Sequence, residues 1–78
     1  MKAHWIPTEF ICPLTKKVMR NPAVIEGGNT FEKKAIQEHF ERVGATDPLT
    51  KKGLKSVAIV PNVALRSLIG KYWTLQSQ

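Results

Sequence analysis

Few side chains in this sequence could act as covalent catalysts or metal ligands. The 78 residues include one cysteine, Cys12, and two histidines, His4 and His39. Structural zinc usually takes four thiolate or imidazole ligands, and the spacing of these three residues matches no zinc pattern. We therefore expect neither a bound metal nor another cofactor.

The thiol of Cys12 is the strongest candidate nucleophile. A catalytic thiol needs a nearby base and surroundings that favour the thiolate. Cys12 instead stands between Ile11 and Pro13 in an apolar segment, where a buried cysteine behaves as a small hydrophobic residue. The six carboxylates show no motif for paired acid–base work. We expect no covalent intermediate on this chain.

Binding is the remaining chemistry, and residues 31–50 are the best candidates for it. We predict an amphipathic helix that begins near Thr30, a suitable N-cap, and ends at Gly44, a suitable residue just after a helix. Glu32 would lie in the first turn, where a negative charge favours the helix dipole. We expect the working surface to form around this helix.

One edge of the predicted helix should face a loop. The apolar stripe of the helix has the spacing i, i+4, i+7 and consists of Ile36, Phe40 and Val43. His39 lies at the edge of that stripe, and Asp47-Pro48 imposes an extended or turned backbone soon after the helix. The helix edge and the proline loop together predict a shallow groove.

Shorter elements should surround the central helix. Residues 23–25 are prone to form a strand, residues 26–29 are typical of a turn, and residues 30–31 can return as the second strand of a hairpin. A third strand is predicted over residues 57–60. A last helix is expected to begin at Asn62, a suitable N-cap. Its core-facing stripe would consist of Leu65, Leu68, Ile69 and Tyr72.

The predicted fold class is α+β, a small domain with a β-hairpin, a central helix, a third short strand and a C-terminal helix. We place the domain at residues 6–75, with residues 1–5 as a lead-in and residues 76–78 as a frayed C-terminus. We expect no internal repeat.

The net charge of +6 comes from 12 basic and 6 acidic residues, and it permits an acidic partner or nucleic acid. The basic residues are spread along the chain and are not interleaved with aromatic residues as in single-strand binders. We interpret this charge as a solvated surface, so nucleic acid is not favoured as a partner. No apolar segment is long enough to span a membrane, and we expect a soluble protein in a reducing compartment.

Seven short fragments follow one another in a characteristic order and spacing. They are Ile6-Pro7, Phe10-Ile11-Cys12-Pro13-Leu14, Met19 followed by Asn21-Pro22, Gly28-Asn29-Thr30-Phe31-Glu32, Ala35-Ile36, Asp47-Pro48-Leu49-Thr50, and Pro61-Asn62 with Ala64-Leu65. In this order they resemble the U-box domain of ubiquitin ligases, from Ile6 to about Trp73. The resemblance implies a zinc-free RING-like fold, in which hydrogen bonds, salt bridges and apolar packing replace the metal.

The resemblance also implies a polar network that holds two loops in place of zinc. Its candidate members are Asn21, Thr30, Glu32, Asp47, Thr50 and Asn62. The alternative for each is an ordinary turn or cap residue. Asn21 stands where aspartate is common in the family and Lys33 where arginine is common, and both departures are expected to weaken the network.

The function implied by the resemblance is non-covalent. Such a domain docks a ubiquitin-conjugating enzyme that carries ubiquitin as a thioester, and it promotes transfer to a lysine of a protein substrate by positioning. The contacts with the conjugating enzyme are assigned to Ile11 and Pro13 in the first loop, His39 on the helix and Pro48 in the second loop. Phe10 and Leu14 are assigned to the core, and Leu49 stays open.

Each contact residue has a simpler alternative. Ile11 could belong to the core, His39 could be an ordinary surface histidine, and Pro48 could serve to form the turn. Lys51 stands where many active members have an arginine that bridges the conjugating enzyme and ubiquitin. Lysine has the charge but lacks the planar fork of donors, so we expect a weaker bridging residue, or else a solvated lysine.

Two further interpretations remain open from the sequence. The first is a non-catalytic U-box-like module that binds a substrate or assembles a complex. The second concerns Trp5, Tyr72 and Trp73, which either form an exposed surface for a homodimer or for packing on another domain, or complete the core. The resemblance implies a cytoplasmic or nuclear location, because the ubiquitin system operates there, and it implies no membrane partner.

Overall fold

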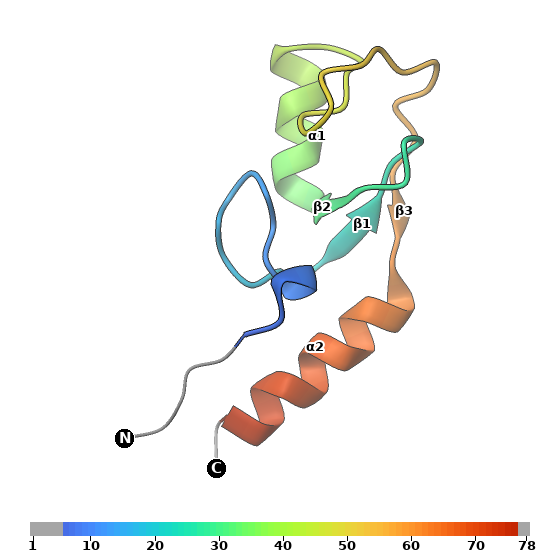
Figure 1. The fold of residues 1–78 in the computed structure, drawn as a ribbon. Coiled ribbons are helices and arrows are strands. Elements are labelled where there is room, and N and C mark those ends of the chain that lie inside the picture. Colours follow the sequence, from blue (N-terminus) through green and yellow to red (C-terminus); the bar gives the residue numbers. More distant parts are fainter. Residues whose placement is uncertain (1–5, 77–78) are drawn as a thin grey trace.

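The structure is a computed structural model, and it describes residues 6–76 of the chain. A single turn of 3-10 helix, η1 (Thr8–Phe10), comes first, and the strands β1 (Pro22–Val24) and β2 (Thr30–Glu32) follow. The central helix α1 (Lys33–Arg42) continues directly from β2. The last two elements are β3 (Val60–Pro61) and α2 (Val63–Gln76), as Figure 1 shows.

The three short strands form one antiparallel sheet in the order β2-β1-β3. In the centre of the sheet, Ala23 lies opposite Phe31 on one side and opposite Pro61 on the other. Proline has no N–H to donate, so its place in the edge strand β3 is a favourable one. The predicted hairpin is confirmed. The predicted third strand was placed too early, because the pairing with β1 begins only at Val60.

The central helix begins later than the sequence predicts. Thr30 is not its N-cap, because residues 30–32 pair with β1 along their whole length. Glu32 takes the N-cap position without a side-chain cap hydrogen bond, since its carboxylate is engaged elsewhere. The end of the helix is as predicted: Gly44 has φ +116°, and its N–H donates to the carbonyl of His39 at 3.3 Å.

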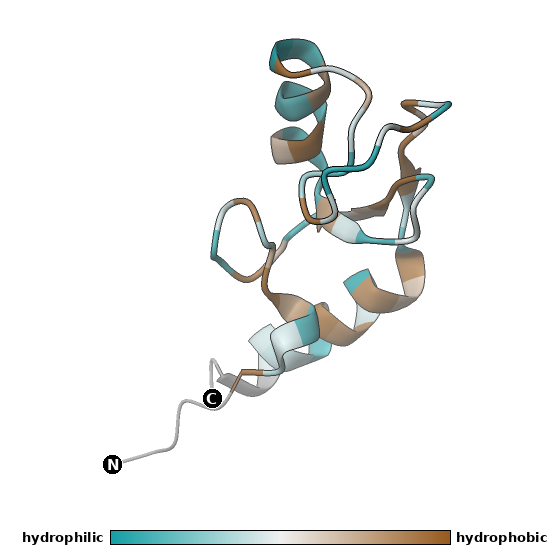
Figure 2. Ribbon diagram, turned by 45° about the horizontal axis from the view of Figure 1, so that its top comes forward, coloured by the Kyte–Doolittle hydropathy of each residue, from teal (hydrophilic) through white to brown (hydrophobic). Residues whose placement is uncertain are grey.

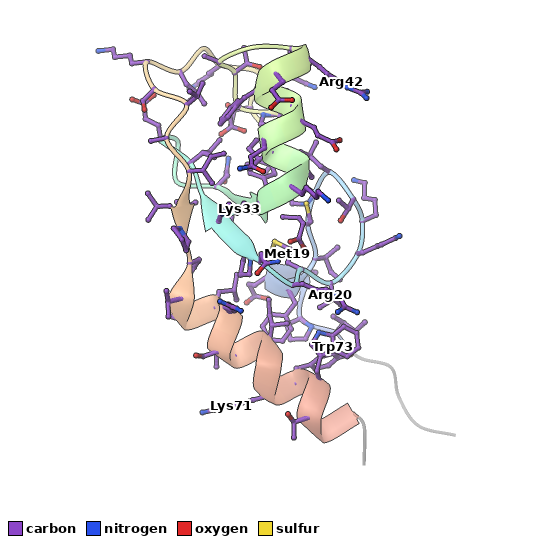
Figure 3. All side chains as sticks on the ribbon, turned by 180° about the vertical axis from the view of Figure 1, so that it is seen from behind. Met19, Arg20, Lys33, Arg42, Lys71 and Trp73 are labelled. Atoms are coloured by element: carbon purple, nitrogen blue, oxygen red, sulfur yellow. The ribbon has the colours of Figure 1, made fainter. Side chains whose placement is uncertain are left out.

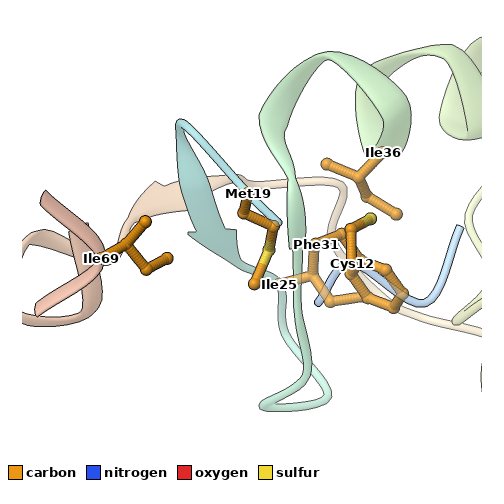
Figure 4. Packing of buried hydrophobic residues seen from close by; sticks show 6 residues of the cluster. All are labelled: Cys12, Met19, Ile25, Phe31, Ile36 and Ile69. Atoms are coloured by element: carbon orange, nitrogen blue, oxygen red, sulfur yellow. The ribbon is translucent and has the colours of Figure 1, made fainter. Parts of the chain in front are cut away.

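The core lies where the sheet, α1, α2 and the first residues of the domain meet (Figure 4). It consists of Cys12, Met19, Ile25, Phe31, Ile36 and Ile69. Burial of Cys12 is therefore confirmed. The prediction that Leu68 faces the core is wrong, because its side chain is 53% exposed. Val43, the last member of the apolar stripe predicted for the central helix, is 65% exposed. Val43 falls beyond the last residue of α1, and Leu68 lies on the side of α2 away from the core.

The helix α2 runs obliquely away from the sheet, on the side opposite α1 (Figure 1). Of its described side chains, only Ile69 is buried. Tyr72 packs edge-to-face on Phe10, with ring centroids 5.6 Å apart, whereas Trp73 is 46% exposed. Trp5 lies outside the described residues. Hydrophobic residues recur along α2, whereas α1 is mostly hydrophilic (Figure 2).

The molecule is elongated, with dimensions of 44 × 22 × 17 Å. The first described residues and the last turn of α2 lie at the same end, and α1 lies at the other (Figure 1). Within residues 6–76, no helix is both long and apolar enough to cross a lipid bilayer.

Candidate functional site

Two loops with nearly the same sequence flank the central helix. The first loop (residues 12–17) reads Cys-Pro-Leu-Thr-Lys-Lys, and the second loop (residues 47–52) reads Asp-Pro-Leu-Thr-Lys-Lys. The expectation of no internal repeat is therefore wrong. The repeat is short and its copies are far apart in the sequence, but the structure shows that they form the same turn.

The two turns match hydrogen bond for hydrogen bond. In the first loop the N–H of Lys16 donates to the carbonyl of Cys12 at 2.8 Å, and the N–H of Cys12 to the carbonyl of Lys17 at 2.9 Å. The equivalent bonds of the second loop, from Lys51 and Asp47, have the same lengths of 2.8 and 2.9 Å.

Each turn also places one lysine in the left-handed region of the backbone. Lys16 has φ 62° and Lys51 has φ 67°, a conformation that costs a side-chain-bearing residue about 1–2 kcal/mol. In the first loop the Oγ1 of Thr15 accepts the N–H of Lys17 at 3.3 Å. The Oγ1 of Thr50 accepts the N–H of Lys52 at the same distance in the second loop. Both loops are therefore closed by their own backbone, and their tips are fixed.

The loops differ at their first residue, which is Asp47 in the second loop. This side chain is 2% exposed. Its carboxylate accepts the N–H of Leu49 at 2.8 Å, the N–H of Thr50 at 3.2 Å and the side-chain amide of Asn29 at 2.9 Å. Asp47 thus ties the second loop to the hairpin turn between β1 and β2.

The surroundings of Asp47 favour its ionised form. Burial raises the pKa of the Asp47 carboxyl, but the N–H of Leu49, the amide of Asn29, the N–H of Thr50 and the charge of His39 lower it. The result is a pKa below the usual value of 3.8. Gly27 makes room for this arrangement, because a Cβ at that position would lie 2.8 Å from Oδ2 of Asp47.

In the first loop, Cys12 takes the place of the aspartate. Its Sγ accepts the N–H of Leu14 at 3.4 Å and the N–H of Glu32 at 3.2 Å. The thiol thus ties the first loop to the end of β2, as Asp47 ties the second loop to the hairpin turn. Neither the role of Asn29 nor this role of Cys12 was predicted from the sequence, although the repeated loop sequence places Cys12 at the position of Asp47.

A second carboxylate fixes the chain before β1. Glu32 accepts the N–H of Arg20 at 2.8 Å and the N–H of Asn21 at 2.9 Å. The carbonyl of Asn21 accepts the N–H of Lys33 at 2.9 Å, so Asn21 contributes to this clamp through its backbone. The hydrogen bonds of Glu32 and Asp47 go to backbone N–H groups and to one amide.

The other candidates for the polar network have more local contacts. Thr50 contributes its N–H to Asp47 and its hydroxyl oxygen to Lys52. Asn62 caps α2 as the sequence predicts, since its Oδ1 accepts the N–H of Leu65 at 3.1 Å. Thr30 is a strand residue opposite Val24.

A groove runs between the first loop and α1. The residues that line it are Leu14, Thr15, Ala35, Glu38, His39, Arg42 and Val43. Assignment of Leu14 to the core is wrong, because the side chain is 38% exposed and lies in this groove. The sequence predicted a groove between the helix and the second loop, but the groove lined by His39 is bounded by the first loop.

His39 is half-buried and has a structural contact of its own. Its Nε2 lies 3.0 Å from both the carbonyl oxygen and Oγ1 of Thr46. This contact ties the last turn of α1 to the residue before the second loop. His39 therefore serves the architecture and lines the groove at the same time.

The remaining predicted contact residues lie elsewhere. Ile11 and Pro13 line a separate hollow, which Leu49 of the second loop also borders. Pro48 is half-buried in the second loop. Lys51 is exposed at the tip of that loop. The structure therefore places His39 in one hollow and Ile11 and Pro13 in another, whereas Pro48 lines neither. It also adds Leu14 and Leu49 as exposed apolar side chains.

Within the described chain, no group of three or more His, Cys, Asp or Glu side chains is placed to hold a metal ion.

Comparison with known proteins gives one consistent match. A family model described as the U-box domain matches residues 6–78. U-box domain-containing protein 24 of Oryza sativa subsp. japonica is 46% identical over 68 residues, which cover 81% of this chain and 8% of that protein. E3 ubiquitin-protein ligase CHIP of Arabidopsis thaliana is 33% identical over 67 residues, 86% of this chain and 24% of that protein.

A solved structure matches the fold as well. The RING finger-like domain of Retinoblastoma Binding Protein-6 superimposes with a TM-score of 0.76 at 26% identity, covering 86% of this chain and 76% of that one. The chain spans less than a quarter of the two plant proteins above.

Proposed function

Because this chain belongs to the U-box family, whose domain is found in E3 ubiquitin ligases such as CHIP, we propose that it docks a ubiquitin-conjugating enzyme loaded with ubiquitin. The bound conjugate is restricted to geometries in which its thioester can react with a lysine of a protein substrate. The gain in rate comes from positioning, and the ligase forms no covalent bond with ubiquitin.

The observation that carries this proposal is the groove between the first loop and α1. Leu14 presents an exposed apolar side chain there, and polar residues such as Thr15, Glu38 and Arg42 surround it. An apolar anchor within a polar rim is typical of a protein–protein contact in which few residues supply most of the binding energy. We therefore assign the leading contact to Leu14, with His39 beside it, in place of Ile11.

The fixed loops support the same function. Each loop is closed by backbone hydrogen bonds, so its tip loses little conformational entropy when a partner binds. The free-energy cost of ordering the loops on binding is therefore low. A contact that forms and dissociates in each round of ubiquitin transfer can then rest on few residues. Pro13, Pro48 and Leu49 border or lie within the same two loops, and we expect them to widen the contact.

Lys51 is the candidate for a residue that touches ubiquitin. It is exposed at the tip of the second loop, and its left-handed backbone fixes the direction in which the side chain leaves the loop. An ammonium group makes a single-point contact, whereas a guanidinium can bridge two acceptors. We expect Lys51→Arg to raise the rate of ubiquitin discharge, and a rate that is unchanged or lower would remove this role.

The test is single-turnover discharge of ubiquitin from a panel of loaded conjugating enzymes onto free lysine. The intact chain should accelerate discharge from at least one enzyme, and Leu14→Ala should remove most of that acceleration, about tenfold or more. Leu68→Ala is the matched control, because Leu68 is an exposed leucine on α2, outside the groove. Ile11→Ala should have a smaller effect than Leu14→Ala.

Two outcomes would contradict the proposal. Acceleration that Leu14→Ala and Leu68→Ala reduce equally would place the contact outside the groove. No acceleration with any enzyme would favour a non-catalytic module that binds a substrate or assembles a complex. Thermal unfolding of each variant shows whether the fold is intact.

A further inference from the structure

A second concave surface lies on a part of the molecule that the groove does not use. It consists of two adjoining hollows between the segment before β1, the start of α1 and one face of α2. The first hollow, of about 390 Å³, is lined by Arg20, Asn21, Arg66, Ile69, Gly70 and Trp73. We call the two hollows together the basic cleft.

The second hollow continues from the first toward α1. Its volume is about 440 Å³, and its lining consists of Arg20, Asn21, Glu32, Lys33, Lys34 and Gln37. Arg20 and Asn21 border both hollows, so the cleft is continuous across them. It shares no lining residue with the Leu14 groove.

One face of α2 forms the wall of the first hollow. Arg66, Ile69, Gly70 and Trp73 follow the spacing i, i+3, i+4, i+7, which places them on a single side of the helix. Gly70 leaves this wall open, because nothing lies within 4 Å of the position that a Cβ would occupy. In Figure 3, Trp73 lies on the same side of α2 as Arg20, whereas Lys71 points away from both.

The opposite wall is held in place by hydrogen bonds. The two oxygens of Glu32 each accept one backbone N–H, from Arg20 and from Asn21, and the N–H of Lys33 donates to the carbonyl of Asn21. Glu32 is the one carboxylate among the residues that line the cleft, and its oxygens bind backbone groups. The cleft therefore has a fixed wall and an excess of positive charge.

The lining selects an anion joined to an apolar group. The guanidinium groups of Arg20 and Arg66 can each bind a carboxylate through two parallel hydrogen bonds. The exposed side chain of Trp73, beside Ile69 and Gly70, offers an apolar contact in the same hollow as these charges. Two hollows in line are longer than a single phosphate or carboxylate requires. One aromatic residue is too few for the series of stacked bases that single-stranded nucleic acid needs.

We propose that the basic cleft binds an extended acidic peptide segment of a protein partner, with carboxylates on Arg20 and Arg66 and an apolar side chain on Trp73. This inference does not rest on the ligase activity, because its residues are separate from the Leu14 groove. The proposal assigns a role to part of the net charge of +6. From the composition alone, this charge was interpreted as that of a solvated surface.

The test is fluorescence anisotropy of a labelled twelve-residue peptide of glutamate and leucine, titrated with the intact 78-residue chain. Two control peptides replace every glutamate by glutamine, or every leucine by serine. We expect the glutamine peptide to bind about tenfold more weakly. Binding of the acidic peptide should weaken as salt rises from 50 to 200 mM, because its carboxylates meet exposed cations.

Variants then locate the binding. Arg66→Glu and Arg20→Glu should each weaken binding about tenfold, whereas Lys71→Glu, the same change of charge on the other side of α2, should have little effect. Trp73→Ala should weaken binding of the leucine peptide more than binding of the serine peptide. All these side chains are exposed, and unfolding midpoints show that each variant folds.

Three results would overturn the proposal. The first is no detectable binding of the acidic peptide. The second is equal weakening by Arg66→Glu and Lys71→Glu, which would mean attraction by net charge alone. The third is tighter binding of a single-stranded oligonucleotide than of the peptide, together with loss of that oligonucleotide binding in Arg66→Glu. This result would assign the cleft to nucleic acid.

Discussion

At the scale of single residues, Asp47 determines how the second loop is joined to the rest of the domain. Its carboxylate gathers three donors, which come from the loop itself and from Asn29 in the hairpin turn. A carboxylate suits this position because it accepts at both oxygens and has nothing to donate. Replacement by the isosteric amide keeps the shape and changes only the hydrogen bonding.

Asp47→Asn should therefore destabilise the domain by about 1–3 kcal/mol, because an NH₂ group would face the NH₂ group of Asn29. The exchanged double variant, Asp47→Asn with Asn29→Asp, restores one donor and one acceptor and should recover part of the loss. Urea unfolding of the two single variants and the double variant measures the coupling. Additive losses would mean that the bond between the two side chains contributes nothing.

The lowered pKa of Asp47 also predicts a dependence of stability on pH. Because its folded-state pKa lies below the usual 3.8, the stabilisation is complete at pH values above 3.8. It is lost as the pH falls through the folded-state pKa. The difference in unfolding free energy between the intact chain and Asp47→Asn should stay constant at neutral pH and narrow in acid. A difference that is unchanged down to pH 2 would contradict the assignment.

At the scale of elements, the two loops are the same turn built twice with a different first residue. The repeat can be read in the sequence, but the backbone conformation that the two loops share cannot. Lys16 and Lys51 both adopt positive φ, which lysine rarely does. That conformation follows from the hydrogen bonds that close each turn.

Glycine at either lysine should therefore stabilise the domain. Lys16→Gly and Lys51→Gly relieve about 1–2 kcal/mol of left-handed strain and add about 0.5–1 kcal/mol of unfolded-state entropy. We expect the free energy of unfolding measured in urea to rise by up to about 1.5 kcal/mol. Lys17→Gly and Lys52→Gly remove the same charge without relieving strain, and they should lower stability. Losses of similar size at all four positions would argue against strain at Lys16 and Lys51.

The elements also show which features a single sequence can predict. The hairpin, Gly44 after α1 and the Asn62 cap depend on neighbouring residues, and they were predicted correctly. Thr30 was placed at the start of α1 because it is a good cap, but pairing with β1 keeps it in a strand. Leu14 was assigned to the core because it is apolar, but the closed turn directs it outward. These errors depend on backbone hydrogen bonds that form only when the hairpin and the loop close.

The contact between His39 and Thr46 could not be predicted for the same reason. Spacing placed His39 at the edge of a helix stripe, but it could not show that the ring reaches the backbone before the second loop. The separation of His39 from Ile11 and Pro13 into two hollows is likewise a property of the folded chain. Sequence reasoning found the family and most of the elements, and the structure was needed to place Leu14 in the groove.

At the scale of the whole molecule, α2 is held to the rest of the domain by few buried groups. Ile69 is its one buried side chain within the part of the helix whose side chains are described. Leu65 packs against the same core cluster, and Tyr72 packs on Phe10. A domain of this size has a small margin of stability. The attachment of α2 therefore depends strongly on a single residue.

Ile69→Ala should destabilise the domain by about 2–4 kcal/mol, since it removes a buried side chain and leaves a cavity. Leu68→Ala, one residue earlier and 53% exposed, should change stability by no more than about 0.5 kcal/mol. Thermal unfolding followed by circular dichroism compares the two. Equal and small effects would mean that α2 is held mainly by its exposed contacts.

The elongated shape has a consequence for any polypeptide fused to this domain. Both ends of the described chain lie at one end of the molecule, and α1 lies at the other. A tether that starts at either end and returns along the 44 Å axis needs about 13 residues of fully extended chain. A shorter tether would confine the attached polypeptide to the α2 end. The length of the tether would therefore determine which lysines of an attached substrate can reach the α1 end.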